Sequence, residues 1–136
     1  MKNKNETGFS LIELIICIVI IGILAAISIP SFIKSKIVAE NRAAVGQLSA
    51  MRNAQLTFYA QSKRFARLDE LNSIQSGNLG TTIDAQTIRR GAFVYTLTTA
   101  DANLNDNYYI IALRDNDTPF TYRYTLDQSG TIDRIE

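Results

Sequence analysis

The sequence has little of the residue types on which most catalytic and metal sites depend. Its 136 residues include no histidine, no tryptophan, two prolines and one cysteine. Without histidine the chain cannot form a Ser-His-Asp triad, a Cys-His pair or a histidine-ligated metal site. The single cysteine, Cys17, also excludes an intramolecular disulfide. We therefore expect no enzyme and predict no catalytic, metal or cofactor-binding residues.

Charge of either sign is nearly balanced. Fourteen Lys and Arg residues face thirteen Asp and Glu residues, which gives a formal net charge of +1. No strongly basic field points to nucleic acid, so nucleic acid is not expected as a partner. The length fits one small domain with one modest core.

A long uncharged apolar run dominates the N-terminal part. From Leu14 to Ile33 the chain carries no charged residue. The run Phe9–Ile29 has about 21 residues, and a helix of that length spans roughly 30 Å of hydrocarbon. The two lysines of residues 1–8 keep this end on the cytoplasmic side by the positive-inside rule. The pattern predicts a membrane helix that spans the bilayer once.

A cleaved secretory signal is the alternative interpretation of this run. Ala26-Ile27-Ser28 has the small-x-small pattern of a cleavage site. However, the run is longer than the roughly 7 to 15 residues of an ordinary signal, and Glu13 lies inside it. A carboxylate within a membrane helix costs about 2.5 to 3.5 kcal/mol, so Glu13 needs a cation that the apolar run does not contain.

The octapeptide G-F-S-L-I-E-L-I occupies Gly8 to Ile15, after a short basic leader and at the start of the apolar helix. It resembles the class III signal of type IV prepilins and pseudopilins. The resemblance continues through Gly22 to Pro30, so it covers about the first 30 residues. It implies a structural subunit of a type IV pilus-like filament that polymerises through its N-terminal helix.

The resemblance also implies roles for Gly8, Phe9 and Glu13. Gly8 would be the last residue of a leader, residues 1–8, that a prepilin peptidase removes on the cytoplasmic face. Phe9 would become the new N-terminus, usually N-methylated, and its amine would be protonated. Glu13 would pair with that amine on a neighbouring subunit, because a desolvated charge favours an arrangement that supplies its partner. The alternative is a Glu13 that snorkels or stays protonated in the bilayer.

The helical pattern continues beyond the predicted membrane segment. Apolar residues recur at steps of three, four and seven: Ile33, Ile37, Ala44, Leu48, Met51 and Phe58. Charged and polar residues take mostly other positions: Lys34, Lys36, Glu40, Arg42, Arg52 and Gln55. We expect one helix from Phe9 to about Ser62, roughly 80 Å long. Its residues 9–30 would form the transmembrane and filament-core part, and residues 31–62 its amphipathic half.

Gly22 and Pro30 are the two weak points of this predicted helix. Both residue types lower helix propensity, and an interior proline costs about 3 kcal/mol. Two separate helices broken at Pro30 are therefore the alternative. The resemblance implies that the segment between Gly22 and Pro30 is locally unwound in the filament, which lets the polymer stretch.

Residues 31–136 are expected to form a pilin-like head. Residues 63–90 are predicted to form a long loop with a short turn of helix near Asp84 to Ile88. Within residues 91–136, alternation predicts three antiparallel strands with one face on the helix. The residues that share a face in each strand are Phe93, Tyr95 and Leu97; Tyr109, Ile111 and Leu113; and Phe120, Tyr122, Tyr124 and Leu126. A fourth short strand is predicted from Thr131 to Ile135. The fold class is α+β, with a long N-terminal α-helix on a small antiparallel sheet of three to four strands.

The kind of filament stays open at the level of sequence. Many type IV pilins have a C-terminal disulfide, which this chain lacks, whereas the major pseudopilin of type II secretion binds calcium in a C-terminal loop. Here only Asp115, Asn116 and Asp117 offer oxygen ligands, and turn chemistry explains them more simply. We favour an extracellular type IV pilus, with a periplasmic pseudopilus of type II secretion as the alternative.

A minor pilin whose head binds DNA or a surface is a further alternative. Arg64, Arg67, Arg89 and Arg90 could form a small basic patch, although solvated arginines that flank a loop explain them more simply. The expected partners are other pilins in a homopolymer or mixed filament, a prepilin peptidase and the inner-membrane assembly machinery. The chain would span the inner membrane before assembly.

Overall fold

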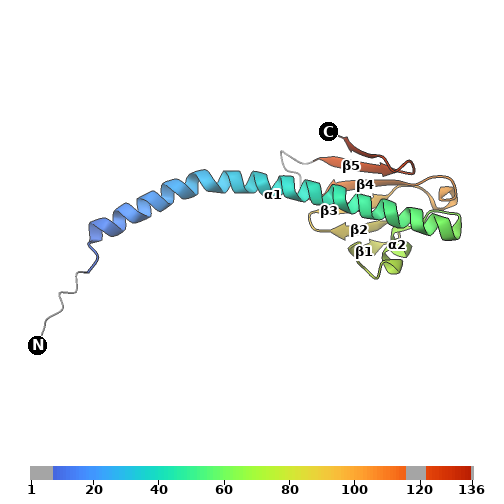
Figure 1. The fold of residues 1–136 in the computed structure, drawn as a ribbon, viewed down its shortest axis with the longest axis horizontal. Coiled ribbons are helices and arrows are strands. Elements are labelled where there is room, and N and C mark those ends of the chain that lie inside the picture. The colour runs from blue at the N-terminus through green and yellow to red at the C-terminus, as the bar shows by residue number, and fades with distance from the viewer. Residues whose placement is uncertain (1–7, 116–121, 136) are drawn as a thin grey trace, which may run out of the picture. The chain divides into compact units, whose positions relative to one another are not determined.

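The computed structural model describes residues 8–115 and 122–135. Its dominant element is helix α1, Leu11–Ser62, a continuous run of 52 residues with Pro30 inside it (Figure 1). The expected single helix is therefore confirmed, and the alternative of two helices broken at Pro30 is wrong for the isolated chain. The chain divides into two compact units, with the boundary between Lys36 and Ile37.

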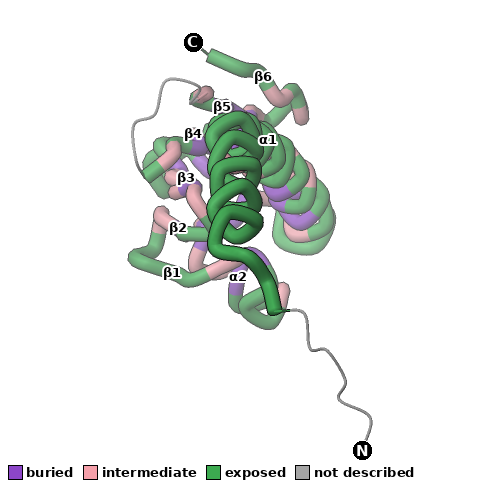
Figure 2. Tube along the Cα trace, turned by 90° about the vertical axis from the view of Figure 1, so that its left-hand side faces the viewer, coloured by how far each residue is buried: buried purple, intermediate pink, exposed green. Residues whose placement is uncertain are grey.

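In the first unit, helix α1 exposes almost every side chain. Between Gly8 and Lys36 only Ala25 is half-buried, and the remaining residues are exposed. Large apolar side chains are among them, with Ile27 71% and Phe32 72% exposed. Figure 2 shows this part of the tube as almost continuously exposed. These residues have the composition of a core but no packing within the unit.

In the second unit, helix α1 buries one face. The buried residues recur at helical spacing: Ile37, Asn41, Ala44, Gln47, Leu48, Met51, Ala54 and Gln55. Leu48 and Met51 are fully buried, as the apolar periodicity predicted. Ile33, which was placed on the same face, is 52% exposed because it lies in the first unit. Helix and sheet therefore share one hydrophobic core in the head.

The region between helix and sheet is more ordered than predicted. It contains helix α2, Leu68–Ile74, and a hairpin of strands β1, Thr81–Asp84, and β2, Thr87–Arg90. The predicted helical turn near Asp84 to Ile88 is wrong. The Asp84 carboxylate instead accepts the backbone N–H of Gln86 at 2.8 Å, which closes a tight turn between the strands. The predicted long loop of residues 63–90 is therefore wrong as well.

Over the described part of the chain, the sheet has six strands in the order β1-β2-β3-β4-β5-β6, with antiparallel neighbours throughout. The remaining elements are β3, Phe93–Leu97; a short 3-10 helix η1, Asp101–Asn103; β4, Tyr109–Arg114; β5, Arg123–Asp127; and β6, Ile132–Ile135. The α+β class and the antiparallel sheet are confirmed. The strand count exceeds the predicted three to four because of the β1-β2 hairpin. Phe120, which was predicted to share a face with Tyr122, lies outside the described residues.

The predicted face of strand β4 is wrong. Ile110 and Ala112 are fully buried, whereas Tyr109 is 37% and Leu113 42% exposed. Alternation could not choose the face, because both faces of Tyr109–Arg114 carry apolar residues. The register decides it, since Ile110 pairs with the buried Leu97. In β3 and β5 the shared faces of Phe93 to Leu97 and of Tyr124 with Leu126 are buried as expected.

Two buried glutamines of helix α1 fasten the connecting region to the helix, and the buried Asn72 ties together parts of the connecting region itself. The Gln55 side chain donates to the Ala66 carbonyl and accepts the Ala66 N–H, both at 2.8 Å. Gln47 donates to the Leu79 carbonyl at 2.7 Å, and Asn72 accepts the Leu79 N–H at 3.0 Å. Sequence analysis placed Gln55 among the polar positions, yet it is fully buried. Its burial is tolerated because both amide groups are satisfied.

Candidate processing and assembly site

The predicted cleavage position lies in exposed chain that precedes helix α1. Gly8, Phe9 and Ser10 have no regular secondary structure and are exposed, Phe9 to 84%. A Cβ atom added at Gly8 would meet no other atom within 4 Å. The packing of this chain therefore does not require glycine there, so any such requirement must come from a partner that handles this segment. Residues 1–7 of the predicted leader lie outside the described part.

Glu13 begins helix α1 with a capping interaction. Its carboxylate accepts the backbone N–H of Ser10 at 2.8 Å, and the Leu14 N–H donates to the Ser10 carbonyl at 3.2 Å. Ser10 and Glu13 have the spacing of a capping box, and a carboxylate in the first turn also complements the helix dipole. The Ser10 N–H was not predicted as a partner of Glu13, although the S-x-x-E spacing of Ser10 and Glu13 indicates it.

The stretch that follows is apolar and long enough to cross a membrane. Helix α1 contains an 18-residue window with a mean hydropathy of 3.0, none of it buried within the chain. The exposed side chains are mostly isoleucine, leucine and valine. Such a surface is stable only in a bilayer or against other apolar helices. The exposed free thiol of Cys17 lies within this stretch.

Gly22 and Pro30 lie further along the same helix. The Pro30 ring removes the N–H that would bond the Ala26 carbonyl. Two serine hydroxyls near it donate to carbonyls one turn back, Ser28 to Leu24 at 2.8 Å and Ser35 to Ser31 at 3.0 Å. Such back-bonds compete with the helical ladder and often accompany bends. The helix is continuous through both residues, although Pro30 removes one hydrogen bond from its ladder.

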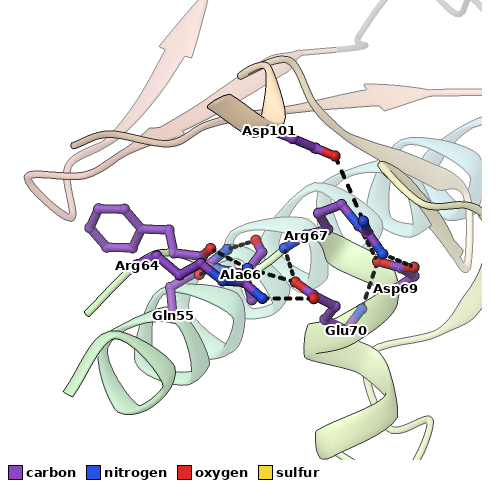
Figure 3. Close-up of polar contacts among 8 residues, drawn as sticks. Gln55, Arg64, Ala66, Arg67, Asp69, Glu70 and Asp101 are labelled. Carbon is purple, nitrogen blue, oxygen red and sulfur yellow. Dashed lines mark hydrogen bonds and ion pairs between the residues drawn. The ribbon is translucent and has the colours of Figure 1, made fainter. Parts of the chain in front are cut away.

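Two of the four arginines proposed for a basic patch are neutralised in one ion-pair cluster (Figure 3). Arg64 makes two hydrogen bonds to the Glu70 carboxylate, at 2.9 and 2.8 Å. Arg67 binds Asp69 at 3.1 Å and lies 3.7 Å from Asp101. The hydrogen bond from Arg64 lowers the pKa of Glu70 to about 2, and the one from Arg67 lowers the pKa of Asp69. The cluster connects α2 with η1 and is structural.

The other two arginines, Arg89 and Arg90, also have polar partners within the head. Arg89 forms an ion pair with Asp115 at 2.6 Å, and Arg90 donates to the Asn78 carbonyl. The four arginines therefore do not form a free basic patch. Asp115 was one of three possible calcium ligands; Asn116 and Asp117 lie outside the described residues. Within residues 8–115 and 122–135, no group of three or more His, Cys, Asp or Glu residues could hold a metal ion.

Comparison with known proteins gives the same family at the N-terminus. Residues 3–29 match the family model of the prokaryotic N-terminal methylation motif. The chain is 44% identical over 64 residues to the type IV major pilin protein PilA of Myxococcus xanthus. It is 30% identical over 70 residues to the type II secretion system core protein G of Aeromonas hydrophila, and 38% identical over 53 residues to that of Vibrio cholerae.

These matches are partial. They cover 47%, 52% and 39% of this chain, and 29%, 49% and 36% of the respective relatives. The chain thus spans about half or less of the length of the curated relatives that it matches. No solved structure matches it. The chain carries the prokaryotic N-terminal methylation motif, and its resemblance to type IV pilins and to type II secretion pseudopilins is confirmed.

Proposed function

We propose that this protein is a structural subunit of a type IV pilus-like filament that polymerises through the first half of helix α1. The exposed apolar surface from Leu11 to Ile33 supports this most directly, because the first unit leaves it unburied next to a head with a complete core. The hydrophobic effect contributes about 25 cal/mol per Å² of such surface removed from solvent. Before assembly a bilayer covers this surface, and in the filament neighbouring helices would cover it.

The first step is cleavage between Gly8 and Phe9 by a prepilin peptidase at the cytoplasmic face. The exposure of this segment and the match to the methylation motif support the step. Mass spectrometry and N-terminal sequencing of the mature protein provide the test. A chain that begins with a methylated Phe9 is expected. A first residue at Ser10 or later, or a start at Pro30, would contradict the proposal.

Glu13 would then gain a second partner in the filament. In the free chain its carboxylate accepts the Ser10 N–H, whereas in the filament it would also face the protonated amine of Phe9 on a neighbouring subunit. Glutamine can still accept that N–H but carries no charge. We therefore expect Glu13→Gln and Glu13→Ala both to be cleaved normally and both to lose filaments. Normal filaments from Glu13→Gln would show that only the cap matters.

The outer face of helix α1 in the head is also suited to close packing. Ala39, Ala43, Gly46 and Ala50 recur at steps of three and four, and all are exposed. Small residues let the backbones of neighbouring helices approach closely. This face would allow the second half of α1 to contact neighbouring subunits while its other face holds the head.

The fate of the filament separates the two closest alternatives. We propose that the filament is a surface pilus, with a pseudopilus of type II secretion as the alternative. Both are considered because the curated relatives include a type IV pilin and type II secretion core proteins. Electron microscopy of intact cells is the test, and filaments outside the cell favour the pilus. Neither alternative includes an enzymatic role. A minor pilin that binds DNA is disfavoured, because carboxylates neutralise three of the four candidate arginines.

A further inference from the structure

The antiparallel sheet of the head gathers arginines at one end of its strands. Arg89 and Arg90 end β2, Arg114 ends β4, Arg123 begins β5, and Arg134 is one residue from the end of β6. The register places them together, because Arg90 and Arg114 both pair with Phe93, and Arg134 pairs with Tyr124, the neighbour of Arg123. We call this the basic end. Figure 1 shows these strand termini at the same end of the sheet.

The opposite end of the same strands carries carboxylates. Asp84 ends β1, Asp127 ends β5, and Asp101 and Asp106 lie in the connection between β3 and β4. The register again places them together, since Tyr109, the first residue of β4, pairs with Asp127. The Leu97 N–H donates to the Gln86 carbonyl, which brings the turn after Asp84 to the same end. These four aspartates define the acidic end.

Ion pairs within the head neutralise only part of the charge at each end of the sheet. At the basic end Arg89 pairs with Asp115, and Arg114 pairs with Glu40, but Arg123 is exposed, and Arg90 is exposed with a neutral carbonyl as its partner. At the acidic end Arg67 and Arg52 approach Asp101 and Gly130 respectively, while Asp84, Asp101 and Asp106 remain exposed. Among the residues that the structure describes, arginines outnumber carboxylates at the basic end, and carboxylates outnumber arginines at the acidic end.

We propose that the heads dock end to end, with the basic end of one copy against the acidic end of the next copy. The occupant is a second copy of this chain, because it presents the complementary charge in the same protein. Such a contact joins two different surfaces and need not close, so repetition extends a filament. Contacts between two like ends would repel, and this sets a common orientation of the heads. The inference rests on the proposed function as a filament subunit.

Charge reversal in the full chain tests the contact. Arg90→Glu with Arg123→Glu makes the basic end acidic, and Asp101→Lys with Asp106→Lys makes the acidic end basic. Each pair alone should reduce the filament pelleted from sheared cells by about fivefold or more, because like charges then meet. All four substitutions together should restore the yield to within about twofold of the wild type, which a folding defect would not do. Asp133→Lys is the control: Asp133 is an exposed carboxylate of the edge strand β6, opposite Thr125 at the midpoint of β5, and its reversal should leave the yield unchanged.

The outcomes distinguish this inference from the function on which it rests. If the wild-type chain forms no filaments, the proposed function fails. If wild type and all variants polymerise equally, only end-to-end docking fails. A loss with the arginine variant that the aspartate substitutions do not rescue would also overturn it, and would indicate that the arginines face an anionic lipid surface instead.

Discussion

The two parts of helix α1 use similar residues in opposite ways. In the first unit Ile20 is 52% exposed, and neighbouring isoleucines and leucines are similarly exposed. In the head Leu48 of the same helix is fully buried against the sheet. The difference lies in what the chain supplies, because the head contains a sheet that covers the helix, whereas the described residues 8–36 of the first unit contain only the helix and the short segment before it. Apolar composition predicts a need for burial, and the rest of the chain determines whether that need is met internally.

The comparison extends to polar groups. In the head the buried amides of Gln47, Gln55 and Asn72 have hydrogen-bond partners within the head. In the first unit the carboxylate of Glu13 accepts the backbone N–H of Ser10. The head therefore forms a core of its own, whereas the described part of the N-terminal unit leaves its apolar side chains exposed.

The largest expected effect comes from truncating one apolar residue in each part of helix α1, Leu48 in the head and Ile20 in the first unit. Leu48→Ala should lower the free energy of unfolding of the head by about 3 kcal/mol, because it leaves a cavity in a packed core. Ile20→Ala should leave that free energy unchanged within about 0.5 kcal/mol. Chemical unfolding of the full chain in detergent, followed by tyrosine circular dichroism, measures both. Equal effects would contradict the division into two parts.

Next in size is the loss of the buried amide of Gln55. Gln55→Ala leaves the N–H and carbonyl of Ala66 buried without partners, and should cost about 2 kcal/mol. Gln61→Ala, at an exposed position of the same helix, is the matched control and should be nearly neutral. The same unfolding measurement applies. A neutral Gln55→Ala would mean that water replaces the amide.

A smaller effect on the stability of the head is expected when the pH is lowered. The pKa of Glu70 is about 2 in the folded chain against an ordinary value of 4.5, so its ion pair with Arg64 stabilises the head fully above pH 4.5. This contribution should fall progressively as the pH drops from about 4.5 to 2, by about 1 kcal/mol after allowance for solvent screening. Glu70→Gln should remove this part of the pH dependence. Stability curves of the two proteins that stay parallel over that window would argue against the ion pair.

The smallest effect on the stability of the head is expected from substitutions at Gly22 and Pro30 in the first part of helix α1. Pro30→Ala restores a donor for the Ala26 carbonyl, and Gly22→Ala raises helix propensity. Both should leave head unfolding unchanged, yet slow amide hydrogen exchange near residues 26–31. In filaments the double variant should extend less under force. Unchanged exchange would indicate that Pro30 does not weaken the helix.

The sequence predicted the secondary structure correctly where a segment has a single apolar periodicity. The helix to Ser62, strand β3 and the place of β6 follow directly from residue patterns. It failed for β4, where Tyr109–Arg114 is apolar on both faces, and for Thr81–Arg90, where four-residue strands rich in threonine and arginine have no apolar alternation. For the candidate site it identified Gly8, Phe9 and Glu13 through a local motif. It missed the Ser10 partner because that contact is a cap and not an ion pair.

By itself the sequence determined the apolar N-terminal helix, its motif and the absence of histidine chemistry, because these depend on composition and on spacings shorter than a few turns. Only the tertiary structure decided the sheet face of β4, the burial of Gln55 and the grouping of charges at opposite ends of the sheet. The face of β4 and the grouping of charges depend on the register between paired strands, and the burial of Gln55 depends on where Ala66 meets helix α1. Short spacings thus determine the apolar helix and its motif, and the fold determines which surfaces the head presents.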